Sequence, residues 1–223
     1  MHVFEGISQE AFEFLVALRF NNNKPWFEQN KATFETKLKQ PLYQLADELG
    51  DTIRQIDADM EIRPQRVVSR IYRDARRIKG GPPYRDYLWL GFRPHGIAKE
   101  ESFIIYIDVS AFSMEIGAGF YSGDVERIRA FKQRILAAPT VFKNVVEDKG
   151  LQGFTWGGQE YKRPKIDPDA PEWLVPFLKK KSLHIFKHIP EEYYGSAQLI
   201  SVLKEDILAL GPLYKYVTDE GSR

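Results

Sequence analysis

The sequence predicts a single α+β domain over residues 1–223, in which an antiparallel sheet is flanked by N-terminal and C-terminal helices. Apolar side chains recur at helical spacing towards both ends of the chain, whereas the middle holds short runs rich in β-branched and aromatic residues. Helical and extended segments do not alternate strictly, and this favours α+β over a doubly wound parallel sheet.

The N-terminal segments are predicted to be helical. Ser8 can cap a first helix whose apolar side chains recur every three or four residues. Residues 21–25, with three asparagines followed by lysine and proline, end that helix. A longer apolar stripe then runs over residues 26–53, and Pro41 is expected to kink or divide it because proline removes a helical hydrogen bond.

The middle of the chain reads as β structure, and the short connections favour antiparallel pairing. Strands are expected at residues 87–92, 102–109, 112–121 and 182–189. Further helices are expected at residues 124–136, 140–147, after a cap at Asp169, and at 196–210, where Gly211 and Pro212 are expected to end the last one.

Composition excludes several classes of function. The chain has no cysteine, so it has no disulfide, thiolate nucleophile or thiolate metal site. The first residues lack the basic and apolar regions of a secretory signal, and no apolar run is long enough to span a bilayer. We therefore expect a cytoplasmic protein without a membrane partner.

Positive charge is concentrated in one segment. The whole chain has a formal net charge of +1, but residues 63–85 contain eight arginines and lysines against Asp74, a local charge of +7 that leaves −6 for the remainder. Such a distribution predicts a focused positive site.

Arginine is suited to such a site because its planar guanidinium donates paired hydrogen bonds to carboxylate or phosphate oxygens. Asp74 could orient one guanidinium, and the turn at residues 80–83 could return the following side chains towards it. The sequence thus predicts a pocket, binding or catalytic, for a small phosphorylated or carboxylated ligand on segment 66–85. The expected ligand-binding residues are Arg70, Arg73, Asp74, Arg76, Lys79, Tyr84 and Arg85.

Alternatives to this pocket remain open. The segment can be a strand that ends in a loop, which Val67 and Val68 favour, or a helix with its arginines in one stripe. Its charges can form a solvated face paired with acidic helices. They can also bind nucleic acid, although the net charge of −6 on the rest of the chain would repel a long polyanion. They can also contact an acidic protein partner.

Other chemistry-bearing residues give weaker indications. Trp26 could stack on a ring, but an aromatic anchor between helices is the simpler interpretation. His184 and His188 would share a face of a strand without an acidic ligand at a metal-site spacing. Asp108 and Glu115 lie in predicted strands, where outward-facing carboxylates are expected before an acid–base pair. Phosphate-loop, dinucleotide and HExxH motifs are absent, so we expect no cofactor and no metal.

Three motifs carry a resemblance to a known family. They are N-N-x-x-x-W-F at residues 21–27, R-I-Y-R-D-x-R-x-x-K-x-x-x-P-Y at residues 70–84, and G-x-G-x-Y at residues 117–121. In this order they resemble a widespread family of conserved hypothetical proteins, a domain of unknown function. The resemblance implies one compact α+β domain and assigns no activity. Arg77-Ile78 and Arg85 stand where the family usually has Phe-Ser and lysine, and both departures keep or raise the positive charge.

Overall fold

A computed structural model describes residues 4–74, 76, 80–120 and 125–218 of the chain. Its α-helices and one π-helical segment, η1, are α1 (Gln9–Phe20), α2 (Lys24–Thr33), η1 (Phe34–Lys39), α3 (Gln40–Ile56), α4 (Pro64–Val67), α6 (Val125–Ala137), α7 (Pro139–Val146), α8 (Val175–Leu178) and α9 (Gln198–Thr218). Short 3-10 turns are η2 (Lys99–Glu101), η3 (Lys149–Leu151), η4 (Glu172–Leu174) and η5 (Glu191–Tyr193). The strands are β1 (Tyr87–Phe92), β2 (Phe103–Ser110), β3 (Met114–Phe120), β4 (Thr155–Gly157) and β5 (His184–His188).

The strands form one antiparallel sheet in the order β1-β2-β3-β5-β4. A tight turn at residues 111–113 joins β2 to β3, and the longer connection 93–102, which contains η2, joins β1 to β2. Strand β5 pairs with β3 only after the chain has formed α6, α7 and α8. The predicted strands therefore exist within one or two residues of their expected bounds, and the predicted α+β architecture is confirmed.

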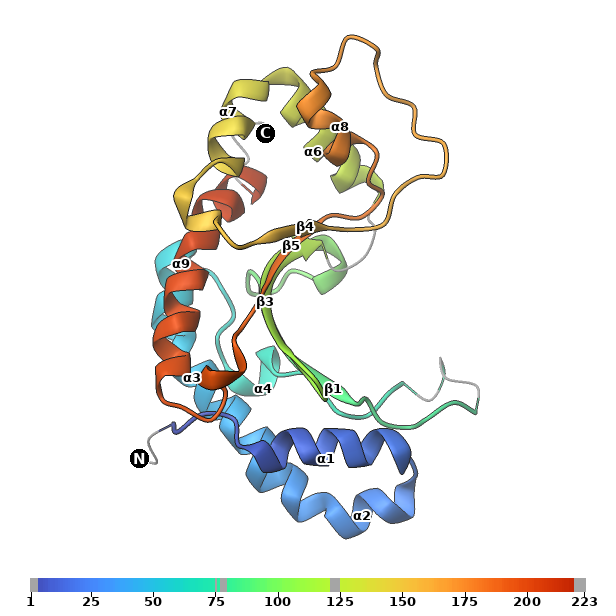
Figure 1. The fold of residues 1–223 in the computed structure, drawn as a ribbon, viewed down its shortest axis with the longest axis vertical. Coiled ribbons are helices and arrows are strands. Elements are labelled where there is room, and N and C mark those ends of the chain that lie inside the picture. Colours follow the sequence, from blue (N-terminus) through green and yellow to red (C-terminus); the bar gives the residue numbers. More distant parts are fainter. Residues whose placement is uncertain (1–3, 75, 77–79, 121–124, 219–223) are drawn as a thin grey trace.

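One face of the sheet is covered by α3 and α9, which run side by side across it (Figure 1). Alternate residues of each strand point to this face and are buried, for example Ile105, Ile107 and Val109 of β2. The main hydrophobic core lies between these strand residues and the apolar stripes of the two helices. The intervening residues of each strand therefore point to the opposite face of the sheet.

Helices α1 and α2 pack below the sheet in the view of Figure 1. Ser8 occupies the expected cap position of α1, but its hydroxyl makes no capping hydrogen bond. Pro41 does not break the second helical segment. It lies in the first turn of α3, where a missing N–H is tolerated, and η1 joins α2 to α3 without interruption.

The prediction that the last helix ends at residues 211–212 is wrong, because α9 continues to Thr218 with Pro212 inside it. A proline inside a helix costs about 3 kcal/mol or more. Leu213 and Tyr214 beyond it are buried at 0% and 2% exposure, and burying such side chains contributes about 1.5–3 kcal/mol each. The carbonyl that loses its donor belongs to Leu208, on the exposed side of the helix.

The upper part of the molecule in Figure 1 has a smaller core of its own. It gathers buried side chains of α6, α7 and α8, with Phe142 of α7 in contact with the rings of several neighbours. This part and the N-terminal helices stand at opposite ends of the sheet, so the uncovered face lies between them. Among the described residues, no helix is both long enough and apolar enough to cross a lipid bilayer.

Candidate functional site

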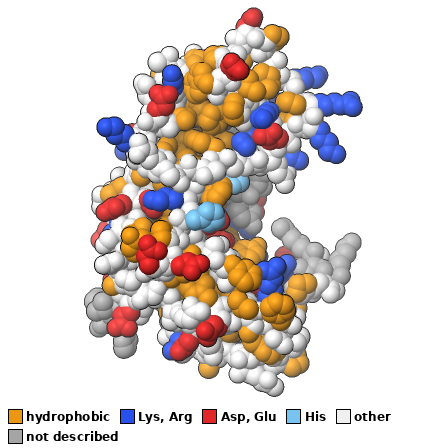
Figure 2. Space-filling view, in the orientation of Figure 1, with side chains coloured by type: hydrophobic (Ala, Val, Ile, Leu, Met, Phe, Trp, Pro, Cys, Tyr) orange, Lys and Arg blue, Asp and Glu red, His pale blue; other side chains and the backbone are white. Residues whose placement is uncertain are grey.

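The face of the sheet opposite α3 and α9 is here called the open face. Cross-strand register assigns its side chains, because residues directly opposite each other point to the same side. They include aromatic, acidic and imidazole groups, namely Trp89, Tyr106, Asp108, Glu115, His184, Phe186 and His188. Figure 2 shows histidine side chains in the middle of the molecule, where the surface is hollowed between the upper part and the N-terminal part.

Glycines let several rings on the open face lie flat against the sheet. A β-carbon added to Gly91 would lie 2.3 Å from the Trp89 ring, and one added to Gly117 would lie 2.8 Å from the Tyr106 ring. The His184 ring covers Gly157 in the same way. The result is a broad, low floor of rings, a shape on which a flat ligand can stack.

Asp108 has the most strongly perturbed carboxyl group of this floor. Burial raises its pKa to about 7, and the carboxylate of Glu115, directly opposite on β3, adds to the effect. Within the described residues, its oxygens accept no hydrogen bond and contact no cation. Asp108 therefore carries a proton for much of the time near neutral pH.

Glu115 has a different environment. Its carboxylate lies 3.3 Å from Nδ1 of His188 on β5, a partner that Asp108 lacks. His184, further along β5, has its pKa lowered by burial and by the charge of Lys180, so its imidazole is neutral at neutral pH. In the part of the chain that the structure describes, no three histidine or acidic side chains are grouped so as to hold a metal ion.

The basic segment forms an extended arm beside β1, defined here as residues 68–74 and 80–86. Isolated bridges at Val68–Leu90 and Tyr72–Tyr84 connect it to β1 and to itself. Residues 68–74 are therefore extended rather than helical, but no regular strand is formed there, and Arg66 and Val67 lie in the short helix α4. Asn22 anchors the arm: its side-chain oxygen accepts the Tyr84 N–H, and its amide donates to the Tyr84 carbonyl, both at 3.0 Å.

Phe27 completes this anchor by stacking on the Tyr84 ring at 4.2 Å between centroids. Phe27 and Tyr84 are both buried, whereas Trp26 is only partly covered. The first two sequence motifs thus contact each other directly, and the simpler interpretation of the asparagine–tryptophan segment, an interhelical turn with aromatic anchors, agrees with this packing.

The predicted ligand-binding residues have separate positions. At the base of the arm, the Arg73 Nε donates a hydrogen bond to the Tyr84 carbonyl at 2.9 Å. A terminal guanidinium nitrogen of Arg85 donates to the carbonyls of Arg70 and Tyr72. These guanidinium groups donate to neutral backbone oxygens, which do not compensate their charge. Arg73 also lies 3.7 Å from the Asp86 carboxylate.

The remaining members of that set lie further out. Arg76 makes a two-pronged ion pair with Asp74, at 2.8 and 2.9 Å, and its side chain is 89% exposed. Arg70 is also exposed. Lys79 lies outside the described residues. Thus Arg73, Tyr84 and Arg85 are close together, and the Asp74–Arg76 pair is a surface feature apart from them.

A cavity of about 310 Å³ lies where the base of the arm meets the open face. It is lined by Arg19, Asp86, Tyr87, Asp108, Ser110, Ala111 and Phe112. At its edge the two oxygens of Asp86 face two cations: Arg19 and Arg73 each lie 3.7 Å away, too far for a direct hydrogen bond. We call this place the junction cavity.

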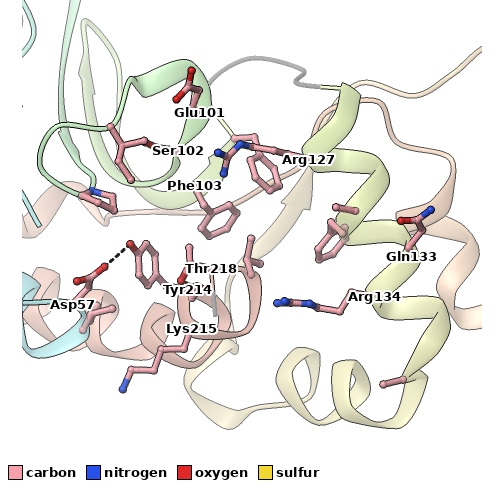
Figure 3. A pocket seen from close by; sticks show the side chains of 18 of the residues that line it. Asp57, Glu101, Ser102, Phe103, Arg127, Gln133, Arg134, Tyr214, Lys215 and Thr218 are labelled. Atoms are coloured by element: carbon pink, nitrogen blue, oxygen red, sulfur yellow. Dashed lines mark hydrogen bonds between the residues drawn. The ribbon is translucent and has the colours of Figure 1, made fainter. Parts of the chain in front are cut away.

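A larger cavity of about 1320 Å³ lies at the far end of the strands, between α6 and the end of α9 (Figure 3). Several of its polar groups have partners in the protein. Tyr214 donates a hydrogen bond to Asp57, and Arg134 donates to the Tyr216 carbonyl and lies over the Tyr216 ring. The junction cavity differs in that one of its lining carboxyl groups, Asp108, has a strongly raised pKa.

Comparison with protein-family models gives one match, over residues 10–216, to the family described as "Conserved hypothetical protein (DUF2461)". The chain belongs to this family. A search of curated proteins found no match. DUF2461 membership agrees with the resemblance drawn from the three motifs, and its description assigns no chemistry to any residue.

Arg19, Asp86 and the open face were not predicted as a site. Part of the signal was present, because Tyr106, Asp108 and Ser110 alternate with buried residues along one strand and must share a face. What the sequence did not reveal is that β5 pairs with β3, and that the end of α1 lies against the base of the arm.

Proposed function

We propose that this DUF2461 protein binds a small phosphorylated or carboxylated molecule in the junction cavity. The observation that supports the proposal best is the arrangement of Arg19 and Arg73 around Asp86, with both guanidinium groups 3.7 Å from a single carboxylate. Two positive charges meet one negative charge there, so the site keeps an excess of positive charge that an oxyanion can satisfy.

The surroundings suit a ligand of moderate size. Volumes of about 300–1,000 Å³ are typical of ligand pockets, and the junction cavity, at about 310 Å³, continues onto the open face. An anionic group near Arg19 would leave the rest of the ligand free to lie on the ring floor. Arg85 and Tyr84 would support the cavity indirectly, by holding the arm in place.

The proposal is tested by titrating the labelled protein with sulfate, benzoate and a panel of phosphorylated and carboxylated metabolites, followed by NMR and thermal unfolding. Arg19→Gln should weaken binding about tenfold or more, since a hydrogen bond to a charged group contributes about 1.5–3 kcal/mol. Arg76→Gln is the matched control: it removes a guanidinium of the basic segment that is paired with Asp74 on the surface, and it should leave the affinity unchanged.

Two results would contradict the proposal. One is the absence of stabilisation by every anion tested, and the other is equal loss of affinity in both variants. Tight binding of an oligonucleotide with a steep dependence on salt would instead support the nucleic-acid alternative, since each neutralised phosphate of duplex DNA contributes a slope of about −0.9.

A further inference from the structure

The open face contains a carboxyl group that the anion site has to accommodate. Asp108 lines the junction cavity together with Arg19. Any anion held by Arg19 would therefore come close to Asp108, and an ionised Asp108 would repel it. An oxyanion therefore binds there more favourably when this carboxyl is protonated.

We propose that Asp108 is a ligand-binding residue that acts in its protonated form: it donates a hydrogen bond to an oxygen of the bound anion, so the anion and one proton bind together. This inference rests on the proposed function. It adds to that function a specificity for ligands with a hydrogen-bond-accepting oxyanion, and a dependence on pH that the arginines cannot produce, because arginine stays charged.

The surroundings of Asp108 favour its protonated form. Asp108 is partly buried on a strand, its oxygens meet no donor or cation among the described residues, and Glu115 lies directly opposite. The pKa of Asp108 is raised accordingly, first by burial and then by Glu115. A protonated carboxyl also has the O–H that an incoming oxyanion requires.

Each neighbouring element contributes groups that act on this proton. Glu115 favours the protonated form of Asp108. A cation would favour the ionised form, and Arg19 lines the same cavity. The titratable and charged groups are Tyr106 from β2, Tyr87 from β1, Glu115 from β3, His188 from β5 beyond Glu115, Arg19 from α1 and Asp86 from the arm.

The first measurement needs no ligand. Asp108 is followed by carbon NMR of its carboxyl group through a pH titration, and Asp108→Asn identifies the resonance. The expected midpoint is about 7. A midpoint near the ordinary value of 3.8 overturns the proposal, because the residue would then be ionised throughout the neutral range.

The second measurement is the affinity for sulfate and benzoate, whose own charges do not change between about pH 6 and about pH 8. Affinity should follow the protonated fraction of Asp108, and should therefore fall about tenfold over this range. Asp108→Asn keeps the shape and a donor, so its affinity should be nearly independent of pH. Glu115→Gln should move the fall to lower pH.

The outcomes separate this inference from the proposed function. If the anions bind through Arg19 with an affinity that does not change with pH, the role of Asp108 is refuted and the binding site stands. If Asp108 titrates near pH 7 but no anion binds at any pH, the proposed function fails and this inference fails with it. Asp47→Asn, at an exposed position of α3, is the control and should change neither measurement.

Discussion

Replacing Asp108 with asparagine should stabilise the protein at neutral and alkaline pH. The substitution keeps the size of the side chain and removes a charge that the fold holds without a partner. Burial and Glu115 raise the pKa of Asp108 from 3.8 to about 7, so the folded state binds the proton more tightly than the unfolded state does.

The sign and the size follow from this difference. Well below pH 3.8 the carboxyl is protonated in both states and contributes no penalty. As the pH rises from 3.8 to about 7, the unfolded state ionises first, and the free energy of unfolding falls. Each pKa unit corresponds to about 1.4 kcal/mol, so the penalty above about pH 7 is about 4 kcal/mol at most.

Urea unfolding at about pH 4, 6 and 8 measures this effect. The difference between Asp108→Asn and the wild type should be small at about pH 4 and should grow to between 1 and about 4 kcal/mol by about pH 8. Asp47→Asn, at an exposed position, should show no such trend. A difference that stays constant with pH, or one in which the variant is the less stable protein at pH 8, would show that Asp108 is ionised and satisfied in the fold.

Three further predictions concern residues that support the fold around the site. Urea unfolding measures the expected change in the free energy of unfolding for each variant. Gly117→Ala should destabilise the protein by about 2–3 kcal/mol, because the new β-carbon would lie 2.2 Å from the Ile185 carbonyl oxygen of the neighbouring strand. Asn22→Ala should cost about 2 kcal/mol through its two hydrogen bonds to Tyr84 and should speed tryptic cleavage of the arm. Glu61→Gln should cost about 1 kcal/mol at neutral pH and nothing near pH 2, because hydrogen bonds from a neighbouring arginine lower the pKa of this carboxyl from 4.5 to about 2, and stability is lost as the pH falls through that range.

Local patterns were sufficient to predict most of the fold. The alternation of Ile105, Ile107 and Val109 with polar residues identifies β2 and also the side that faces the core. The prediction failed where a local rule competes with packing at a distance. Pro212 normally ends a helix, but the buried side chains beyond it make continuation of α9 favourable.

The candidate site was predicted less well, for a physical reason. The density of positive charge predicted a site on the basic segment, but a run of arginines does not indicate whether each side chain contacts a ligand, a backbone carbonyl or a carboxylate. In the structure Arg73 and Arg85 bond to backbone oxygens, and Arg76 bonds to Asp74. The arginine that lines the junction cavity, Arg19, lies outside the basic segment, at the end of α1.

The position of Asp108 is costly for folding, and this cost is itself an argument for function. Asparagine, serine or threonine would fit a partly buried strand position beside Glu115 without placing two carboxyl groups opposite each other. The pKa difference of Asp108 therefore measures stability that the fold forgoes at neutral pH. Groups with such unfavourable placement occur more often in binding and catalytic sites than elsewhere. Because Asp108 also lines a cavity with an arginine, ligand binding explains a feature that folding alone does not.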